Sequence, residues 1–296
     1  MRRATILILS VIVSFIFSSV PRGEDTGTDT LLLKVMTINL RHNKDFWEER
    51  FPLVADEIVR LKPDIIGLQE VAIGIDQSKH LRDLIREKSA AAGEPLTYYK
   101  YEQLKTGEYY FYGEGIGILS RFPMLKTDFA DLENGRPVVL ARIKIADNLT
   151  VDMYNTHLHH MGGDEVRLPQ AEKITQLMKS RDSGHLTFLT GDMNSSPDSK
   201  TIKHFLEAGF TDSFMAAPEE ARTKNPNTSP VILSKTPFPQ SHVNRIDFVF
   251  VKPAAEGGPA ARPVSSEVCF QNHAPNGLYP SDHLGVMTTF EISLNR

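Results

Sequence analysis

The chain has 296 residues, of which 41% are hydrophobic and 24% charged, and this composition is typical of a soluble globular protein with a sizeable core. Its formal net charge of −4 argues against tight, nonspecific binding to nucleic acid, which depends on lysine and arginine contacts to phosphates, although it leaves room for a local basic groove. The single cysteine, Cys269, excludes an intramolecular disulfide and a metal cluster held by cysteines alone.

The N-terminus, residues 1–23, has the pattern of a secretory signal peptide. A basic start at 1–3 precedes an apolar run at 4–20, and Pro21 and Gly23 end it after small residues. We therefore predict a secreted or periplasmic protein whose leader is cleaved. The alternative is an uncleaved membrane anchor, because the run is not far short of the roughly 20 residues that a spanning helix needs.

After a polar lead-in at 24–30, which predicts disorder, one domain is expected over 31–296. Short β-rich runs indicate strands, and apolar residues at helical spacing indicate helices. In chain order the first half predicts a strand at 31–40, a helix at 46–61, a strand at 64–68, a helix at 81–93 and two aromatic, glycine-rich strands within 98–119.

The second half of the chain begins with a predicted hairpin that turns at Asp147 and Asn148. The patterns predict its strands at 137–146 and 148–158, then a helix at 166–181, a strand at 187–191, a helix at 201–209, a polar stretch at 216–244 and strands at 245–251 and 285–293. Because hairpins accompany the strand–helix alternation, the sequence favours mixed sheets with helices outside over a doubly wound parallel sheet.

Polar side chains suited to chemistry stand at the ends or starts of several predicted strands. These side chains are Asn39, Glu70, His157, Asp192, Asn194, Asp247, Asp282 and His283. Each has a plainer interpretation by itself: a turn at Asn39, a helix cap at Asp192, or an ion pair between Asp247 and Arg245. Their repeated position at strand ends, where a rigid element fixes geometry, favours one shared site. The neighbouring His159 and His160 are expected on the surface.

This set of side chains fits one chemistry best. Carboxylate and amide oxygens suit a hard cation such as Mg²⁺, and a histidine beside a carboxylate is a common acid–base unit. The sequence contains no G-x-S-x-G elbow, no P-loop and no H-E-x-x-H motif. We therefore expect metal-assisted hydrolysis of a phosphoester.

The ordered motifs MTIN, LQEV, YNTH, GDMN, RIDF and SDHLGV resemble those of the DNase I-like endonuclease/exonuclease/phosphatase superfamily. The resemblance covers nearly the whole chain after the leader, and the ordered set is far more specific than any one tetrapeptide. It implies an α/β (α+β) fold of the DNase I type, a four-layer α/β/β/α sandwich. Two mixed β-sheets would lie face to face, with helices outside and the site at one rim.

The resemblance also implies which residues act at the metal and the water. Asn39 and Glu70 would hold Mg²⁺ or Mn²⁺, and Asp282 is a weaker candidate ligand. Asp192 would orient or deprotonate the attacking water, and Asn194 would contact the phosphate and position Asp192. The motifs do not decide which group takes the proton, and Asp192 is our preferred base.

Two histidines are expected beside the scissile phosphate. By the same resemblance, His157 and His283 would flank it and stabilise its charge, and Asp247 would fix the His283 ring. Glu108 is a candidate carboxylate partner of His157, as in DNase I-type enzymes.

The substrate class stays open, because motifs at a metal centre do not distinguish a nucleic acid, a phospholipid head group and a small phosphate ester. Loops at 73–79, 98–114 and 216–244 are expected to choose among them. The chain lacks the disulfide expected of a secreted DNase I-like nuclease. Its sequence also shows no long apolar hairpin and no dense face of lysine and arginine.

The sequence therefore predicts an exported, metal-dependent phosphoesterase, with a phosphodiester as the first choice of substrate. We expect a monomer without a protein partner. One alternative is a secreted nuclease that acts on DNA or RNA. A second is a non-catalytic binding module on the same fold, which the intact motif set disfavours.

Overall fold

The computed structural model describes residues 29–107, 113–181, 184–236 and 239–294. The predicted signal peptide, most of the lead-in and the candidate Glu108 lie outside these ranges. In the described part of the chain, none of the helices combines the length and the apolar character needed to span a membrane.

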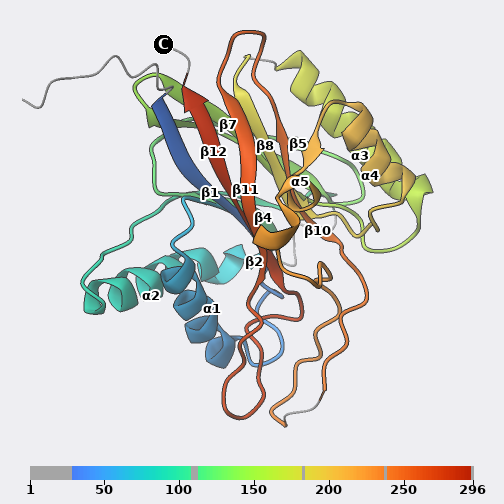
Figure 1. Ribbon diagram of the computed structural model, residues 1–296. Coiled ribbons are helices and arrows are strands. Elements are labelled where there is room, and N and C mark those ends of the chain that lie inside the picture. Colours follow the sequence, from blue (N-terminus) through green and yellow to red (C-terminus); the bar gives the residue numbers. More distant parts are fainter. Residues whose placement is uncertain (1–28, 108–112, 182–183, 237–238, 295–296) are drawn as a thin grey trace, which may run out of the picture.

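Two six-stranded sheets face each other (Figure 1). In spatial order the first contains β11 (Ala260–Cys269), β12 (Gly285–Leu294), β1 (Asp29–Asn39), β2 (Ile65–Ala72), β4 (Glu114–Ser120) and β3 (Tyr99–Leu104). The second contains β5 (Met124–Asp131), β6 (Pro137–Ala146), β7 (Leu149–His157), β8 (Leu186–Asp192), β10 (Asp247–Lys252) and β9 (Thr211–Asp212). Both sheets are mixed. In the first sheet β1 and β2 pair in parallel, in the second β7 and β8 do, and the other neighbouring strands of both sheets pair antiparallel.

Helices cover the outer face of each sheet, so the predicted four-layer sandwich is confirmed (Figure 1). The first sheet carries α1 (Trp47–Leu61) and α2 (Gln77–Ala91), and the second carries α3 (Asp164–Ser180) and α4 (Lys200–Glu207). Shorter elements are η1 (Ile73–Ile75), α5 (Ser213–Ala216) and η3 (Glu219–Ala221). A third apolar cluster, which includes Leu33, Val35 and Phe188, fills the space between the sheets.

The alternation of side chains along each strand carries polar residues into the space between the sheets. On β1, Leu33 and Val35 lie in the central core, and Asn39 follows at the same parity. On β8, Phe188 lies in the same core, and Asp192 follows on the same face. The strand pattern that builds the core therefore also delivers the site residues to one rim.

A buried polar layer joins the two sheets just below that rim. The Gln69 amide nitrogen of β2 donates to Asn155 Oδ1 of β7 at 2.6 Å and to Thr37 Oγ1 of β1 at 3.0 Å. The Thr190 hydroxyl of β8 donates to the same Asn155 oxygen at 3.2 Å. These four side chains have no exposed surface, so the layer is a fully satisfied network inside the core.

The polar layer requires a glycine on β2. A Cβ atom at Gly67 would lie 2.1 Å from Thr190 Oγ1 and 2.6 Å from Asn155 Oδ1. Both distances are too short for non-bonded atoms, so any larger residue would push the sheets apart or break the network.

Three strands were not predicted from the sequence, β5, β9 and β11, and each lies at an edge of a sheet. Most side chains of β5 are exposed or half-buried, so its sequence lacks the apolar signal of a core strand. Strand β9 has only two residues, too few to form a pattern. Strand β11 contains Pro263 and an irregular register between Pro263 and Ser265. Proline argues against a central strand, but an edge strand tolerates it.

Replacing Gly67 by Ala is expected to lower the free energy of unfolding by about 1–3 kcal/mol, because the added methyl group overpacks the polar layer. Urea unfolding would measure the change. Gly74→Ala is the matched control, because a Cβ atom there would meet nothing closer than 3.7 Å. Equal stability of the two variants would contradict the close approach of the sheets at Gly67.

Candidate active site

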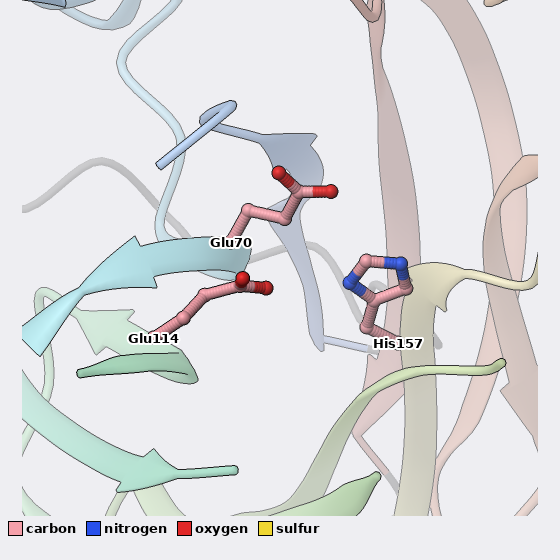
Figure 2. Close-up of side chains that lie close together, drawn as sticks. All are labelled: Glu70, Glu114 and His157. Carbon is pink, nitrogen blue, oxygen red and sulfur yellow. The ribbon is translucent and has the colours of Figure 1, made fainter. Parts of the chain in front are cut away.

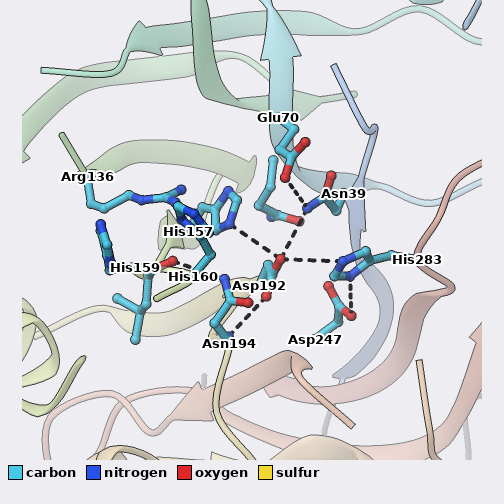
Figure 3. A network of polar contacts seen from close by, with 12 residues as sticks. Asn39, Glu70, Arg136, His157, His159, His160, Asp192, Asn194, Asp247 and His283 are labelled. Atoms are coloured by element: carbon cyan, nitrogen blue, oxygen red, sulfur yellow. Dashed lines mark hydrogen bonds and ion pairs between the residues drawn. The ribbon is translucent and has the colours of Figure 1, made fainter. Parts of the chain in front are cut away.

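Asp192 lies at the centre of the candidate site and ends β8. In the second sheet it is paired in register with His157 of β7 on one side and Asp247 of β10 on the other. From the first sheet, the Asn39 side-chain amide donates to Asp192 Oδ2 at 3.1 Å (Figure 3). Side chains from both sheets thus meet at one carboxylate, which is only 1% exposed.

Glu70 reaches the same place through an irregularity in β2. Its backbone has φ of 49°, and the register with β4 shifts between Leu68 and Val71. A bulge of this kind redirects a side chain at the rim of a sheet. The Asn39 amide donates to Glu70 Oε1 at 3.2 Å, so one amide contacts both Glu70 and Asp192 (Figure 3).

His283, in the loop before β12, lies on the Asp247 side of the centre. Its Nδ1 is 3.0 Å from Asp247 Oδ2 and its Nε2 is 3.8 Å from Asp192 Oδ2. Burial disfavours the charged ring, but the two carboxylates outweigh burial and hold the pKa of His283 well above its ordinary value. Arg245 pairs instead with Asp212, which leaves Asp247 to His283 and rules out the plainer interpretation of Asp247.

His157 lies on the opposite side of Asp192, with its Nε2 3.5 Å from Asp192 Oδ2. Burial lowers the pKa of His157 well below its ordinary value, and the positive charges of Arg136 and Lys105 lower it further. At neutral pH the carboxylate is therefore flanked by one neutral and one protonated imidazole. Such paired groups with pKa values pushed apart are typical of acid–base sites.

The Asp192 carboxyl itself has a raised pKa. Burial raises this pKa to about 7, while the charge of His283 and the bond from the Asn39 amide act against the rise. The main-chain N–H of Asn194 also donates to Asp192 Oδ1, at 3.0 Å. Asn194 has φ of 48°, and its side-chain amide donates to the Leu158 carbonyl at 3.1 Å, which ties the ends of β7 and β8 together.

Asp282 has a different environment. Its Oδ2 lies 3.1 Å from Arg41 Nη1, and its Oδ1 lies 3.4 Å from the Ser281 hydroxyl. Within the described residues it belongs to neither of the two groups of close ligand atoms that could hold a metal. Its role as a metal ligand stays a prediction, with less geometric support than that of Asn39 and Glu70.

The first of these two groups contains Glu70, Glu114 and His157, whose ligand atoms lie within 4.8 Å of one another (Figure 2). The second contains Asp192, Asp247 and His283. The Asn39 amide adjoins both groups, through Glu70 and through Asp192. An oxygen-rich donor set beside the two buried carboxylates of Asp192 and Asp247 fits a hard divalent cation, so the residues present suit the metal that the family resemblance implies.

Sequence reasoning missed Glu114, Lys105 and Arg136 around His157. Glu114 forms an ion pair with the buried Lys105, and Arg136 Nη2 lies 2.8 Å from His160 Nδ1. Glu114 starts β4, so the rule of polar residues at strand starts could have found it; the two cations follow no such rule. His159 is only 8% exposed, so its predicted surface position is wrong.

A separate cavity lies elsewhere on the molecule. It measures about 980 Å³ and lies between the second half of α3, the start of β8 and the end of β10. Lys179, His185, Phe210 and Lys252 are among its lining residues, which include none of the site residues above. The chemistry is therefore assigned to the rim and not to this cavity.

The chain is similar to known proteins over most of its length. A family model described as the Endonuclease/Exonuclease/phosphatase family matches residues 36–283, a range that begins before Asn39 and ends at His283. The protein named angel from Drosophila melanogaster is 28% identical over an alignment of 199 residues, which covers 62% of this chain and 53% of that protein. The chain thus spans about half the length of this relative.

Solved structures share the fold. An endonuclease/exonuclease/phosphatase family protein from Bacteroides thetaiotaomicron superposes with a TM-score of 0.71 at 21% identity, covering 90% of this chain and 96% of that one. A mannosyl-6-phosphatase from the same organism superposes with a TM-score of 0.69 at 21% identity, covering 87% of this chain and 99% of that one. TDP2 from D. rerio, complexed with a single-strand DNA product, superposes with a TM-score of 0.67 at 19% identity, covering 88% of this chain and 98% of that one. At these identities the similarity shows the fold alone.

Replacing Asp247 by Asn is expected to lower the pKa of His283, because it removes the carboxylate 3.0 Å from Nδ1 while burial continues to disfavour the imidazolium. A titration of histidine ring protons by NMR would measure this pKa. Asp83→Asn, on the exposed face of α2, is the control and should leave it unchanged. An unaltered His283 titration in Asp247→Asn would contradict the assigned contact.

Proposed function

Because the chain belongs to the Endonuclease/Exonuclease/phosphatase family, we propose that it is an exported, metal-dependent hydrolase that cleaves a phosphodiester with water. The single observation that carries the proposal is the environment of Asp192. Its buried carboxylate lies between a neutral histidine and a protonated one, and a shared amide links it to Glu70. Metal-assisted hydrolysis of a phosphoester uses these parts together.

In the proposed reaction, Asp192 holds the attacking water and accepts its proton as the water oxygen bonds to phosphorus. A base with a pKa of about 7 is matched to this task at neutral pH. The bond from phosphorus to the leaving oxygen breaks, and that oxygen takes a proton from solvent. Asp192 then releases its own proton to solvent and is ready for another turnover.

The two histidines act on the phosphate that is cleaved. The His283 imidazolium, oriented by Asp247 at 3.0 Å, provides a fixed positive charge beside the negative charge that grows on the phosphate oxygens. Neutral His157 can donate one N–H to the same oxygens without adding charge. The main-chain N–H of Asn194 donates to Asp192 Oδ1 and so keeps the carboxylate oriented.

Glu70 and Asn39 would hold the divalent cation, Mg²⁺ or Mn²⁺. Once bound, the cation would polarise a phosphate oxygen and stabilise the leaving oxygen. The Asn39 amide that contacts Asp192 would then fix the distance between the base and the metal ligands. Lys105 already neutralises Glu114, so Glu114 is the weaker ligand of this group.

A substrate panel tests the function. We expect hydrolysis of a bis-aryl phosphate diester in Mg²⁺ or Mn²⁺, loss of activity in chelator, and slower cleavage of an aryl phosphate monoester. Cleavage of DNA or RNA in the same panel would favour the nuclease alternative, and turnover of sphingomyelin or inositol phosphates would identify a smaller diester or monoester. Absence of turnover of all these substrates with every metal would contradict the proposal. It would favour the alternative of a non-catalytic binding module.

Replacing Asp192 by Asn keeps the shape of the side chain but removes the base, so kcat on the preferred substrate should fall by about a hundredfold or more. Both Asp192 oxygens accept hydrogen bonds, from Asn39 and Asn194, so the midpoint of thermal unfolding is measured alongside kcat to show that the variant is folded. Asp198→Asn, an exposed carboxylate in the loop before α4, is the control. Near-normal kcat in Asp192→Asn would remove Asp192 from the mechanism.

Export is proposed on the apolar run at 4–20 and its basic start alone. Expression of the full chain in an exporting host should release a protein that lacks roughly the first 23 residues, as measured by intact mass. Full-length protein retained in the membrane fraction would instead support the uncleaved anchor.

A further inference from the structure

A fully buried arginine joins two loops that carry site residues from opposite ends of the chain. Arg50, near the start of α1, has no exposed surface. Its guanidinium donates to the main-chain carbonyls of Asp45 at 2.7 Å, Lys44 at 2.8 Å, Leu40 at 3.2 Å and Pro280 at 2.7 Å. The first three belong to the loop after β1, and the fourth belongs to the loop before β12.

The acceptors of Arg50 are unusual for a buried cation. Among the described residues no carboxylate lies within ion-pair distance of it, whereas buried charges are ordinarily paired. Burial lowers the pKa of Arg50 to about 10, so the guanidinium is still charged at neutral pH. A rigid fork of donors can hold several carbonyls at fixed angles, and a single ammonium cannot.

The loop after β1 needs such a restraint. Residues with side chains avoid positive φ, at a cost of roughly 1–2 kcal/mol each. Four residues of this loop have it: Arg41 at 58°, His42 at 48°, Asp45 at 46° and Phe46 at 60°. The carbonyls that accept from Arg50 lie within and beside this strained backbone, which directly follows Asn39.

The loop before β12 is bound at the same junction. Pro280 immediately precedes Ser281, whose hydroxyl donates to the Asn39 carbonyl at 2.6 Å. His283 follows two residues later. Arg50 and Ser281 together therefore fix the main chain beside Asn39 to the main chain beside His283.

We propose that Arg50 is a positioning residue for catalysis, which holds the Asn39 and His283 loops at the spacing that Asp192 requires. This inference rests on the proposed function. Arg50 touches neither Asp192 nor the phosphate position. Its effect is therefore expected in kcat and in metal affinity, both of which depend on the loop geometry, with little change in KM.

The test compares Arg50→Lys with a matched control, Arg142→Lys. Arg142 also forms a bidentate contact, to Asp152 at 2.8 and 3.0 Å, but on the outer face of the second sheet. We expect Arg50→Lys to lower kcat and Mn²⁺ affinity by about tenfold to a hundredfold, as outer contacts of metal sites do. KM should change by less than about threefold, and Arg142→Lys should keep wild-type kcat even if its stability falls.

A second readout does not depend on activity. Hydrogen exchange should become faster in Arg50→Lys at peptides covering 40–46 and 278–284 together, and in neither peptide of Arg142→Lys. If the wild-type protein hydrolyses nothing, the proposed function fails, and exchange together with Mn²⁺ titration still tests the role of Arg50.

Three results would overturn the proposal. They are wild-type kcat and exchange in a folded Arg50→Lys protein, an equal loss of kcat in Arg142→Lys, and failure of Arg50→Lys to fold while Ser281→Ala has normal kcat. The last result would make Arg50 a folding residue. A smaller loss of kcat at unchanged KM in Ser281→Ala would support the junction as the positioning element.

Discussion

The hydrogen bond between Gln69 and Asn155 is the contact on which the rest of the structure depends. It joins the two sheets at 2.6 Å, in a layer without exposed surface that lies directly below the site. The proposed metal ligands Asn39 and Glu70 come from one sheet, and His157, Asp192 and Asp247 come from the other. The distance between the two halves of the site is therefore the distance between the sheets, and the Gly67 backbone lets that distance be short.

The electrostatics of the rim follow from this construction. Closing two sheets on one another removes water from several carboxylates, and burial of like charges is costly without nearby cations. The protein meets part of this cost with the His283 imidazolium and with Lys105 on Glu114. Asp192 keeps a raised pKa, which suits its proposed role of taking a proton from water and releasing it again.

The order of the strands could be predicted only in part from the sequence. The buried strands that carry Asn39, His157 and Asp192 can be recognised in the sequence, because a run of apolar residues ends abruptly in a polar one. The edge strands β5 and β11 could not be recognised in this way. No side chain of β5 is buried, and β11 mixes exposed, half-buried and buried side chains without the pattern of a core strand. The family resemblance, and not periodicity, predicted that the sheets would stack face to face.

The same limit applies to the site. Residues at strand ends were found, but Arg50 was not, because its contacts are main-chain carbonyls up to 230 residues away and no local pattern marks them. Gln69 and Asn155 lie within the LQEV and YNTH motifs, but the neighbouring Glu70 and His157 were interpreted as the chemical groups of those motifs. Burial and distant partners are set by the fold, so a list of residue types cannot reveal them.

The central claim is that Glu70, Asn39 and Asp192 surround one phosphoester at one cation. Anomalous diffraction from a crystal soaked with Mn²⁺ and inorganic phosphate tests it most directly. We expect an anomalous peak within coordination distance of the Glu70 and Asn39 oxygens, at roughly 2.0–2.3 Å, with phosphate bound between His157 and His283. A Mn²⁺ peak only at other residues, or phosphate bound only in the cavity beside α3, would contradict it.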